Sequence, residues 1–488
     1  MADRDALRRR CLGNDLEDNL ALFRELLSAD INSDARFRRF ELSGLPACLV
    51  CLEGMADDRK LSAFVLHARK SPVLSGPADP EAVVDRVLEI AQCDPERRVG
   101  AILDAVVSGM TALIIDGADE AVLMETRGYP ARPVGQATNE SVVLGAQEGF
   151  VESLRTNLTL LRRYAQSADL ISESLTVGRQ TATHVALVYL RGVARKDLVD
   201  EARRRLMTID QPSVQGIGEI QQLIEDDPRA LLPQLLQTER PDRAASCLMD
   251  GQVVILADNS PYALAAPVTL FHQLHASDDS FARWQYGSFL RVVRIAGIAL
   301  SVFLPGLYIA LADHHTHLLP MNLLASIAEA RANVPFPVLT EILLMEFSFY
   351  LINEAGTRIP RQIGSALGIV GALILGQAAV SASIISPILI IIVALTGLGN
   401  YAVPDYGFSL GLVIYRLLVI LSGAALGLYG VCVAACCLAA DVCAMRSLGV
   451  PYVMPVAPAR PHKPDILLRL PVFRQRLRLF ARKGEAQP

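Results

Sequence analysis

The sequence predicts an α+β membrane protein with a cytosolic N-terminal region of two mixed α/β subdomains, followed by a polytopic α-helical membrane domain. Composition is the first observation behind this prediction. Of the 488 residues, 52% are hydrophobic, which is too apolar for a purely soluble chain, whereas 20% are charged, which is too polar for an all-membrane chain. The second observation is that long apolar runs occur only in the C-terminal part. The third is that the residues before them alternate helical and strand-like patterns.

These patterns divide the chain into four parts. We expect a first α/β subdomain over residues 1–145, a second over 146–285, a transmembrane domain over 286–447 and a basic cytosolic tail over 448–488. The formal net charge of −5 gives no basic field, which argues against binding of nucleic acid. The first residues lack an apolar core and a small-residue cleavage site, so we expect no secretory signal and a cytosolic N-terminal region.

Two similar hairpin patterns indicate a duplicated unit in the soluble region. Residues 109–126 and 251–268 each contain an apolar strand, a turn and a second strand. The turns fall at Asp116-Gly117 and Asp258-Asn259, which are residue types that favour tight turns. Between the two hairpins, residues 183–193 predict a buried strand that leads into an amphipathic helix, a βα unit.

The sequence carries no catalytic signature, so we expect neither an enzyme nor a cofactor. It lacks a GxSxG elbow, a phosphate-binding Gly-Lys-Ser/Thr loop and an HExxH helix. The GIGEIQ stretch at Gly216 lacks the third glycine of a dinucleotide site. Cys48 and Cys51 have a CxxC spacing without a second pair, so we expect buried structural thiols. The charges within Thr238–Arg243 are expected to form a solvated salt-bridge cluster at a helix boundary.

The first membrane span is expected over Val292–Ala312, with a kink at Pro305-Gly306. Arg291 and Arg294 are expected to mark its cytosolic side. The DHHTH stretch that follows, Asp313–His317, could bind a metal through its histidines, but no other residue supplies a fixed geometry. A solvated loop on the far side of the membrane is the better interpretation, and we expect no metal site.

Several further apolar segments follow the first span. Residues 321–332 are too short to cross and are expected to lie at the interface or to re-enter, whereas an acidic helix over 338–352 returns to the cytosolic side. Residues 363–385 are expected to cross outward, 388–399 to be re-entrant or buried at depth, and 409–440 to form the final crossing. The arginine-rich tail places the C-terminus in the cytosol. With both ends inside, the number of crossings must be even, which favours four spans plus a re-entrant segment, with six as the alternative.

The acidic helix carries the main functional hypothesis. Glu341 and Glu346 lie in an apolar segment, where a charged group is unfavourable unless it faces protein, a partner charge or water. Glu346, Tyr350 and Asn353 share one helical stripe. The carboxylates could therefore line an ion or water path, or they could pair with arginines and only fix helix packing. The candidates for the path are Glu341, Glu346, Asn353, Gln377 and Ser381. The candidate charge partners are Arg358, Arg361 and Arg416.

Small residues at helical spacing predict close contacts between membrane helices, because they let two backbones approach in lipid. One such stripe follows the acidic helix, and a GxxxG pattern lies in the final apolar segment. The residues are Gly364, Gly368, Ala372, Gly376, Gly423 and Gly427.

Several blocks of sequence, in one order, resemble a known family. They are TERPD at Thr238, LPGLYIAL at Leu304, ARANVPFP at Ala330, NEAGTRIPRQIG at Asn353, GIVGALILGQAAV at Gly368, ISPILIIIVAL at Ile385 and GVPYVMPVAP at Gly449. With these blocks, the chain resembles the A subunit of the GerA-type spore germinant receptors.

The resemblance implies a role and a set of partners. It implies a receptor in the inner membrane of the bacterial spore, assembled with a transporter-like B subunit that recognises the nutrient and a C subunit that is a lipoprotein. It also implies that A subunits form a homo-oligomer. We therefore expect a nutrient-gated cation channel that initiates germination. Two other classes stay open: a secondary transporter with its own solute site, for which the break near Pro387 is a hint, and a non-conducting membrane scaffold.

Overall fold

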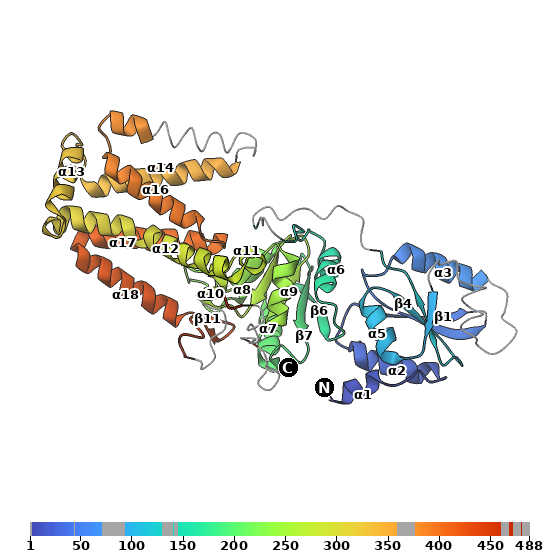
Figure 1. The fold of residues 1–488 in the computed structure, drawn as a ribbon. Coiled ribbons are helices and arrows are strands. Elements are labelled where there is room, and N and C mark those ends of the chain that lie inside the picture. The colour runs from blue at the N-terminus through green and yellow to red at the C-terminus, as the bar shows by residue number, and fades with distance from the viewer. Residues whose placement is uncertain are drawn as a thin grey trace.

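The computed structural model describes residues 2–42, 44–70, 93–128, 140, 145–358, 376–459, 468–471 and 480, and every structural statement below is confined to them. Figure 1 shows two α/β units in succession and a group of long helices beyond the second unit. The predicted mixed α/β region and the helical region that follows it are thus both present.

The first unit is a five-stranded sheet with helices on both faces. Its strands lie in the order β1-β2-β4-β5-β3, and all neighbours are antiparallel. Side chains alternate along β2, so that Cys48 and Val50 pack with α2 and α5, while Leu49 and Cys51 pack with α3. The elements are α1 (Ala2–Arg8), α2 (Leu16–Leu27), β1 (Ala35–Leu42), β2 (Leu45–Leu52), α3 (Asp58–Lys70), β3 (Cys93–Glu96), α5 (Val99–Val107), β4 (Thr111–Ile115) and β5 (Ala121–Met124).

The second unit repeats the first. Its strands lie in the order β6-β7-β9-β10-β8, which is the order of the first sheet when the strands of each unit are numbered along the chain. Both predicted hairpins and the predicted βα unit are present, so the duplication is confirmed. The elements are α6 (Leu154–Tyr164), β6 (Leu170–Val177), β7 (Thr183–Leu190), α7 (Lys196–Thr208), α8 (Ile217–Ile224), β8 (Leu236–Thr238), α9 (Pro241–Met249), β9 (Val253–Ala257) and β10 (Ala263–Ala266).

The two hairpin turns make the same contact with a helix. Asp116 Oδ1 accepts the backbone N–H of Leu16 at 3.2 Å, and Asp258 Oδ1 accepts that of Leu154 at 3.0 Å. These N–H groups open α2 and α6, where the first turn of a helix leaves donors unpaired. Each turn aspartate therefore attaches its hairpin to the start of a helix, α2 in the first unit and α6 in the second. This contact explains why an acidic residue stands at both turns.

A buried ion pair joins the two units. Arg162 of α6 donates from Nη2 to Asp34 Oδ1 at 2.8 Å and to the carbonyl of Leu170 at 3.2 Å. The side chains of Arg162 and Asp34 are only 3% and 6% exposed. Next to them, the N–H of Ser33 donates to the carbonyl of Ser172 at 2.9 Å. Because a buried charge is unfavourable when it loses its partner, these contacts hold the units in one arrangement.

The helical region follows two short helices that leave the second sheet. Two of its helices are long and apolar enough to cross a membrane, namely Trp284–His314, which includes a π-helical end, and Tyr406–Leu426, whereas α16 and α18 are shorter apolar helices. Helix α12 contains Pro305 and continues beyond it. The elements are α10 (Leu270–Leu274), α11 (Asp278–Phe281), α12 (Trp284–Ile309), α13 (Met321–Arg331), α14 (Val338–Arg358), α16 (Pro387–Tyr401), α17 (Tyr406–Leu426) and α18 (Leu428–Ala444).

The final crossing differs from the prediction. Instead of one helix over 409–440, the chain forms α17 and α18, which pack against each other and run in opposite directions (Figure 1). The break lies at Gly427, whose φ of +62° is in the left-handed region that favours glycine. Most of the predicted crossing over 363–385 lies outside the described residues.

The segment after α18 returns to the second α/β unit. It forms a small hairpin of β11 (Arg446–Ser447) and β12 (Val450–Pro451). The Ser447 hydroxyl accepts the N–H of Val268 at 2.9 Å, and Tyr452 donates its hydroxyl to the carbonyl of Pro233 at 2.9 Å. The start of the predicted basic tail is therefore packed on the soluble region, while most of its arginines lie outside the described residues.

Candidate functional site

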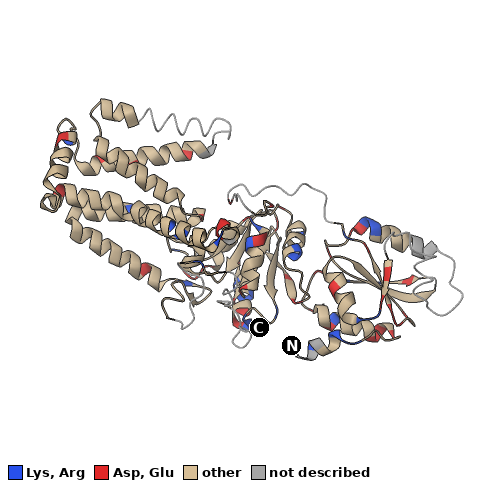
Figure 2. Ribbon diagram, viewed as in Figure 1, with Lys and Arg blue, Asp and Glu red and all other residues tan. Residues whose placement is uncertain are grey.

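A buried polar cluster lies among four helices of the helical region, around Arg416 of α17. Its Nη1 is 3.1 Å from Glu346 Oε2 of α14, and its Nη2 lies 3.0 Å from Ser301 Oγ of α12 and 3.2 Å from Asn400 Oδ1 of α16. Arg416 is 1% exposed and Glu346 is 4% exposed. Figure 2 shows how few charged residues this region contains. The cluster therefore joins α12, α14, α16 and α17 through polar groups in apolar surroundings.

Glycines bring these helices close enough for the cluster to form. A Cβ on Gly399 of α16 would lie 2.3 Å from the carbonyl oxygen of Gly297 on α12, and a Cβ on Gly423 of α17 would lie 2.6 Å from that of Gly306 on α12. Ser301 lies on α12 between these two contacts. Residues without a side chain are needed there, because any larger residue would push the backbones apart.

The Glu346–Arg416 pair is deeply buried, so each partner depends on the other. Removing one partner of such a pair destabilises proteins by about 3–5 kcal/mol, because the remaining charge is left without compensation. The Tyr350 ring also lies 5.9 Å from the Arg416 guanidinium carbon, close enough for a cation–π contact. The structure thus pairs one of the two predicted carboxylates with one of the three predicted arginines.

Glu341 lies in a second polar cluster, where α13, α14 and α16 meet. Its Oε2 accepts the backbone N–H of Ser386 at 2.9 Å, and its Oε1 lies 3.4 Å from Nε of Arg331. Arg331 is also 3.6 Å from Asp313, which follows α12. Arg331 and Asp313 were not among the predicted residues, because they are brought towards Glu341 by the packing of α13 and of the end of α12, which the sequence alone does not show.

The other predicted site residues lie in different surroundings. Asn353 Oδ1 is 3.3 Å from the Tyr401 hydroxyl, which joins the ends of α14 and α16. Gln377 and Ser381 are exposed. Gly427 forms the turn between α17 and α18 instead of a contact inside one helix. The predicted residues Gly364, Gly368, Ala372 and Arg361 lie outside the described residues, as does the side chain of Arg358. Gly376 is buried.

The charged TERPD segment differs from the prediction of a solvated cluster, because Glu239 and Arg240 are buried and Asp242 is partly buried. Arg240 is 0% exposed and Glu239 is 6% exposed. Arg240 donates to Asp242 Oδ2 at 2.7 Å and to the carbonyls of Ala146 and Glu140 at 2.8 and 3.2 Å. The segment therefore fixes the chain that enters the second unit. The sequence alone could not distinguish a buried cluster from a solvated one, because both have the same local pattern of charged residues.

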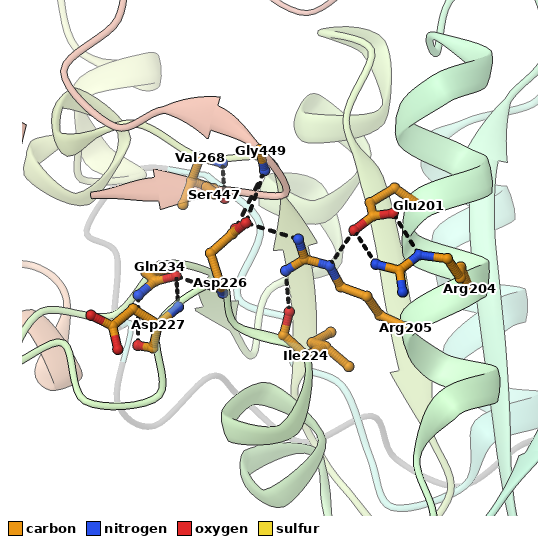
Figure 3. Close-up of polar contacts among 10 residues, drawn as sticks. All are labelled: Glu201, Arg204, Arg205, Ile224, Asp226, Asp227, Gln234, Val268, Ser447 and Gly449. Carbon is orange, nitrogen blue, oxygen red and sulfur yellow. Dashed lines mark hydrogen bonds and ion pairs between the residues drawn. The ribbon is translucent and has the colours of Figure 1, made fainter. Parts of the chain in front are cut away.

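A further polar network joins the second α/β unit to the segment after α18, in a loop over residues 225–235 that we call the junction loop. Asp226 accepts Nη2 of Arg205 at 2.8 Å and the N–H of Gly449 at 3.2 Å (Figure 3). Gln234 is fully buried, and its side chain accepts the N–H groups of Asp226 and Asp227 at 2.8 and 3.1 Å. The junction loop is therefore rigidly held next to the helical region.

Charged residues also fix the start of α12. Arg291 and Arg294, which were predicted to mark the cytosolic side of the membrane, lie 3.3 and 3.0 Å from Asp279 Oδ2. Burial alone would raise the pKa of Asp279, but the hydrogen bonds and charge of Arg294 lower it overall. Asp279 is 0% exposed. The elbow between α11 and α12 is therefore held by an ionised carboxylate between two arginines.

The chain matches one protein family over most of its length. The profile of the Bacillus/Clostridium GerA spore germination protein family matches residues 21–479. The chain belongs to this family. Spore germination protein B1 of Bacillus subtilis is 34% identical over 95% of this chain and 96% of its own length. Spore germination protein GerLA of Bacillus cereus is 33% identical over 91% of this chain and 92% of its own length.

One solved structure also resembles this GerA-family chain. It is the crystal structure of the N-terminal domain of the A subunit of the Bacillus megaterium spore germinant receptor GerK3. The two chains share 28% identity with a TM-score of 0.42, and the match covers 53% of this chain and 96% of that domain.

Two other features of this GerA-family chain show no site chemistry. Cys48 and Cys51 point to opposite faces of β2, and burial raises the pKa of Cys48 to about 12 and that of Cys51 to about 11. Within the described ranges, no three His, Cys, Asp or Glu residues are grouped to hold a metal ion. In the DHHTH stretch, His314 Nε2 instead lies 2.8 Å from the carbonyl of Ala424.

Proposed function

We propose that this chain is the A-type subunit of a spore germinant receptor and that its helical region forms part of a nutrient-gated cation channel in the spore membrane. Family membership supports a role in germination, since B1, GerLA and other relatives are named as spore germination proteins. The two candidate spans support association with a membrane. In this proposal the chain spans the inner spore membrane several times, with both termini in the cytosol.

The observation that carries the proposal is the Glu346–Arg416 pair. Four helices converge on a buried carboxylate and its arginine partner, in apolar surroundings where a helix that only packs would carry apolar residues. While Arg416 compensates Glu346, the carboxylate does not attract a cation. In the proposed mechanism the pair keeps the path closed, and separation of the helices frees Glu346 to attract the permeant ion, as acidic residues do in cation channels.

The proposal also includes partners. A receptor of this family would combine the chain with a transporter-like B subunit, a lipoprotein C subunit and further copies of the A subunit. The junction loop and the elbow before α12 suit such an assembly, because they attach the soluble units firmly to the helices. A movement imposed on the α/β units would therefore reach α12, α17 and α18 directly.

Paired neutral variants test whether the pair has a role beyond packing. Glu346→Gln and Arg416→Gln should each lower the amount of protein in spore membranes, because each leaves one buried charge. The double variant removes both charges, so that neither is left buried without a partner, and should restore the amount of protein. Release of potassium is then measured after addition of amino acids, nucleosides and glucose. Glu354→Gln, at an exposed position of the same helix, is the control.

The outcome of the double variant decides the proposal. We expect a normal protein level with impaired potassium release. A normal level with normal release would assign the pair to packing alone. Purified receptor in liposomes separates the rival classes: ion flux without solute uptake supports the channel, whereas uptake in fixed ratio to the ion supports a secondary transporter.

A further inference from the structure

Four buried polar atoms gather around Glu341, where α12, α13, α14 and α16 meet. They are the Tyr308 hydroxyl, Nε of Arg331, Oε1 of Glu341 and Oγ of Ser386, and none has a hydrogen-bond partner among the described residues. The residues Tyr308, Glu341 and Ser386 are 8%, 2% and 1% exposed. Buried polar groups are normally hydrogen-bonded, so four such atoms at one place require a physical explanation.

The four atoms face one another. Glu341 Oε1 is 3.4 Å from Arg331 Nε, and the other oxygen of Glu341 accepts the N–H of Ser386 at 2.9 Å. The Tyr308 hydroxyl interacts with the side chain of Ser386 and with the charges of Glu341 and Arg331, but its contacts do not reach the geometry of a full hydrogen bond. The atoms are thus close together without satisfying one another directly.

The surroundings of the four atoms are apolar, except on one side. Ile309, Val338, Ile342 and Leu389 form a buried hydrophobic cluster with Tyr308. On the other side, the side chain of Arg331 is 24% exposed and that of its partner Asp313 is 36% exposed. Solvent can therefore reach the cluster along Arg331, while the apolar residues close its other sides.

The hydrogen-bonding roles of the four atoms determine which ligand fits among them. Arg331 Nε–H can only donate, Glu341 Oε1 can only accept, and the two hydroxyls can do both. A mixed set of donors and acceptors suits water, which makes about three hydrogen bonds at buried sites. It suits a bound cation poorly, because a cation needs oxygen ligands only and the Arg331 charge repels it.

We propose that Tyr308, Arg331, Glu341 and Ser386 form a buried hydration site, in which bound water bridges α12, α13, α14 and α16. The two carboxylates of α14 then differ in kind: Glu346 is paired directly with an arginine, whereas Glu341 is hydrated and only loosely paired. This inference does not depend on conduction by the chain. If the helical region does conduct ions, the hydration site marks where the path first meets solvent.

Hydroxyl-radical labelling tests the proposal, because radicals produced from bound water label the side chains that contact it. The full chain is purified in lipid nanodiscs and irradiated in isotopically labelled water. Tyr189 is a matched control, since it is also 8% exposed but donates its hydroxyl to Glu173 at 2.6 Å. We expect the label to enter Tyr308 several-fold faster than Tyr189. Equal or slower labelling of Tyr308 would overturn the hydration site.

Two variants and one change of salt complete the test. Ser386→Ala removes one hydroxyl from the site and should lower the labelling of Tyr308. Ser422→Ala should leave it unchanged, because the Ser422 hydroxyl already donates to the carbonyl of Val419 at 3.1 Å. Replacing N-methylglucamine chloride by potassium chloride at constant ionic strength should have no effect. A fall in Tyr308 labelling with potassium would show that a cation occupies the site, and would overturn the assignment to water.

Discussion

At the scale of single residues, burial decides whether a reactive group can react. Cys48 and Cys51 are 0% and 9% exposed, and burial raises the pKa of their thiols to about 12 and about 11. Only the thiolate is an effective nucleophile. At pH 8 we therefore expect iodoacetamide to label the exposed Cys11 of the native protein and to leave Cys48 and Cys51 unlabelled. Mass spectrometry of the digested protein measures all three.

The same thiols test the geometry of β2. Their side chains lie on opposite faces of one strand, so a mild oxidant should not join them. The raised pKa means that their thiolate fraction becomes appreciable only well above pH 8, so labelling of both should increase as the pH approaches 11. A Cys48–Cys51 disulfide in the native protein, or labelling at the rate of Cys11, would contradict the structure.

Buried charges of the TERPD segment give a second prediction at this scale. Arg240→Lys keeps the charge but cannot reproduce all the contacts with Asp242 and two carbonyls, so we expect the free energy of unfolding to fall by about 1–3 kcal/mol. Arg204→Lys is the control, because the Arg204 side chain is 63% exposed and its pair with Glu201 lies one helical turn away. It should change the stability by about 0.5 kcal/mol or less. Denaturant unfolding of the purified chain measures both.

At the scale of elements, α17 connects the soluble units to the buried pair. Its first turn is held by Asp405, which accepts the N–H of Phe408 at 2.7 Å, and Arg416 lies further along the same helix. Between them, Gly411 meets the junction loop, where an added Cβ would lie 2.4 Å from the carbonyl oxygen of Leu231. Any side chain at this position must displace either α17 or the loop.

Alanine at this glycine tests the connection. Gly411→Ala should destabilise the protein by about 1–3 kcal/mol, because the new methyl group overlaps the backbone of the loop. Gly356→Ala in α14 is the matched control, since no atom lies within 4 Å of its added Cβ. In a helix this change should stabilise by about 0.5–1 kcal/mol. Thermal unfolding in nanodiscs distinguishes them, and an unchanged Gly411→Ala protein would show that the contact is not close in solution.

The α17–α18 hairpin shows what an element-level prediction can miss. The apolar run over 409–440 is long enough for one tilted helix, and its GxxxG spacing is typical of helix contacts. The chain instead turns at Gly427, and Gly430 faces the carbonyl of Ser422 so closely that a Cβ would lie 1.9 Å from it. Apolar length sets an upper limit on a span, whereas a glycine turn within it becomes evident only when both helices are seen together.

At the scale of the whole molecule, the structure shows which segments lie at the same end of the helical region. The segment before α12 and the segment after α18 both pack on the second α/β unit. Gln273 donates to the carbonyl of Leu235 at 3.2 Å, and Ser447 and Tyr452 form hydrogen bonds with Val268 and Pro233. In the proposed membrane-spanning arrangement, both segments therefore lie on the same side of the membrane. Figure 1 places α13 at the opposite end of the helices, away from the α/β units.

Single cysteines in a cysteine-free variant test this arrangement. Ala459→Cys and Ser213→Cys are exposed positions near the soluble end, and Met321→Cys, at a residue 77% exposed, lies at the start of α13. In intact cells, a membrane-impermeant maleimide should label only Met321→Cys. Labelling of Ala459→Cys from outside would contradict a cytosolic C-terminal segment. After lysis all three should react, which controls for accessibility.

The sequence by itself determined the α/β class of the first half, the helical second half and the duplication, because periodicity and turn residues such as Asp116 and Asp258 act within a few positions of themselves. It also pointed to Glu341 and Glu346, since charges in an apolar run stand out locally. Only the tertiary structure decided which groups meet. Arg416 is 70 residues from Glu346, and Arg162 is 128 residues from Asp34. Such contacts depend on how whole elements pack, because several arginines satisfy the same local pattern and the tertiary structure sets the distance of each from the carboxylate.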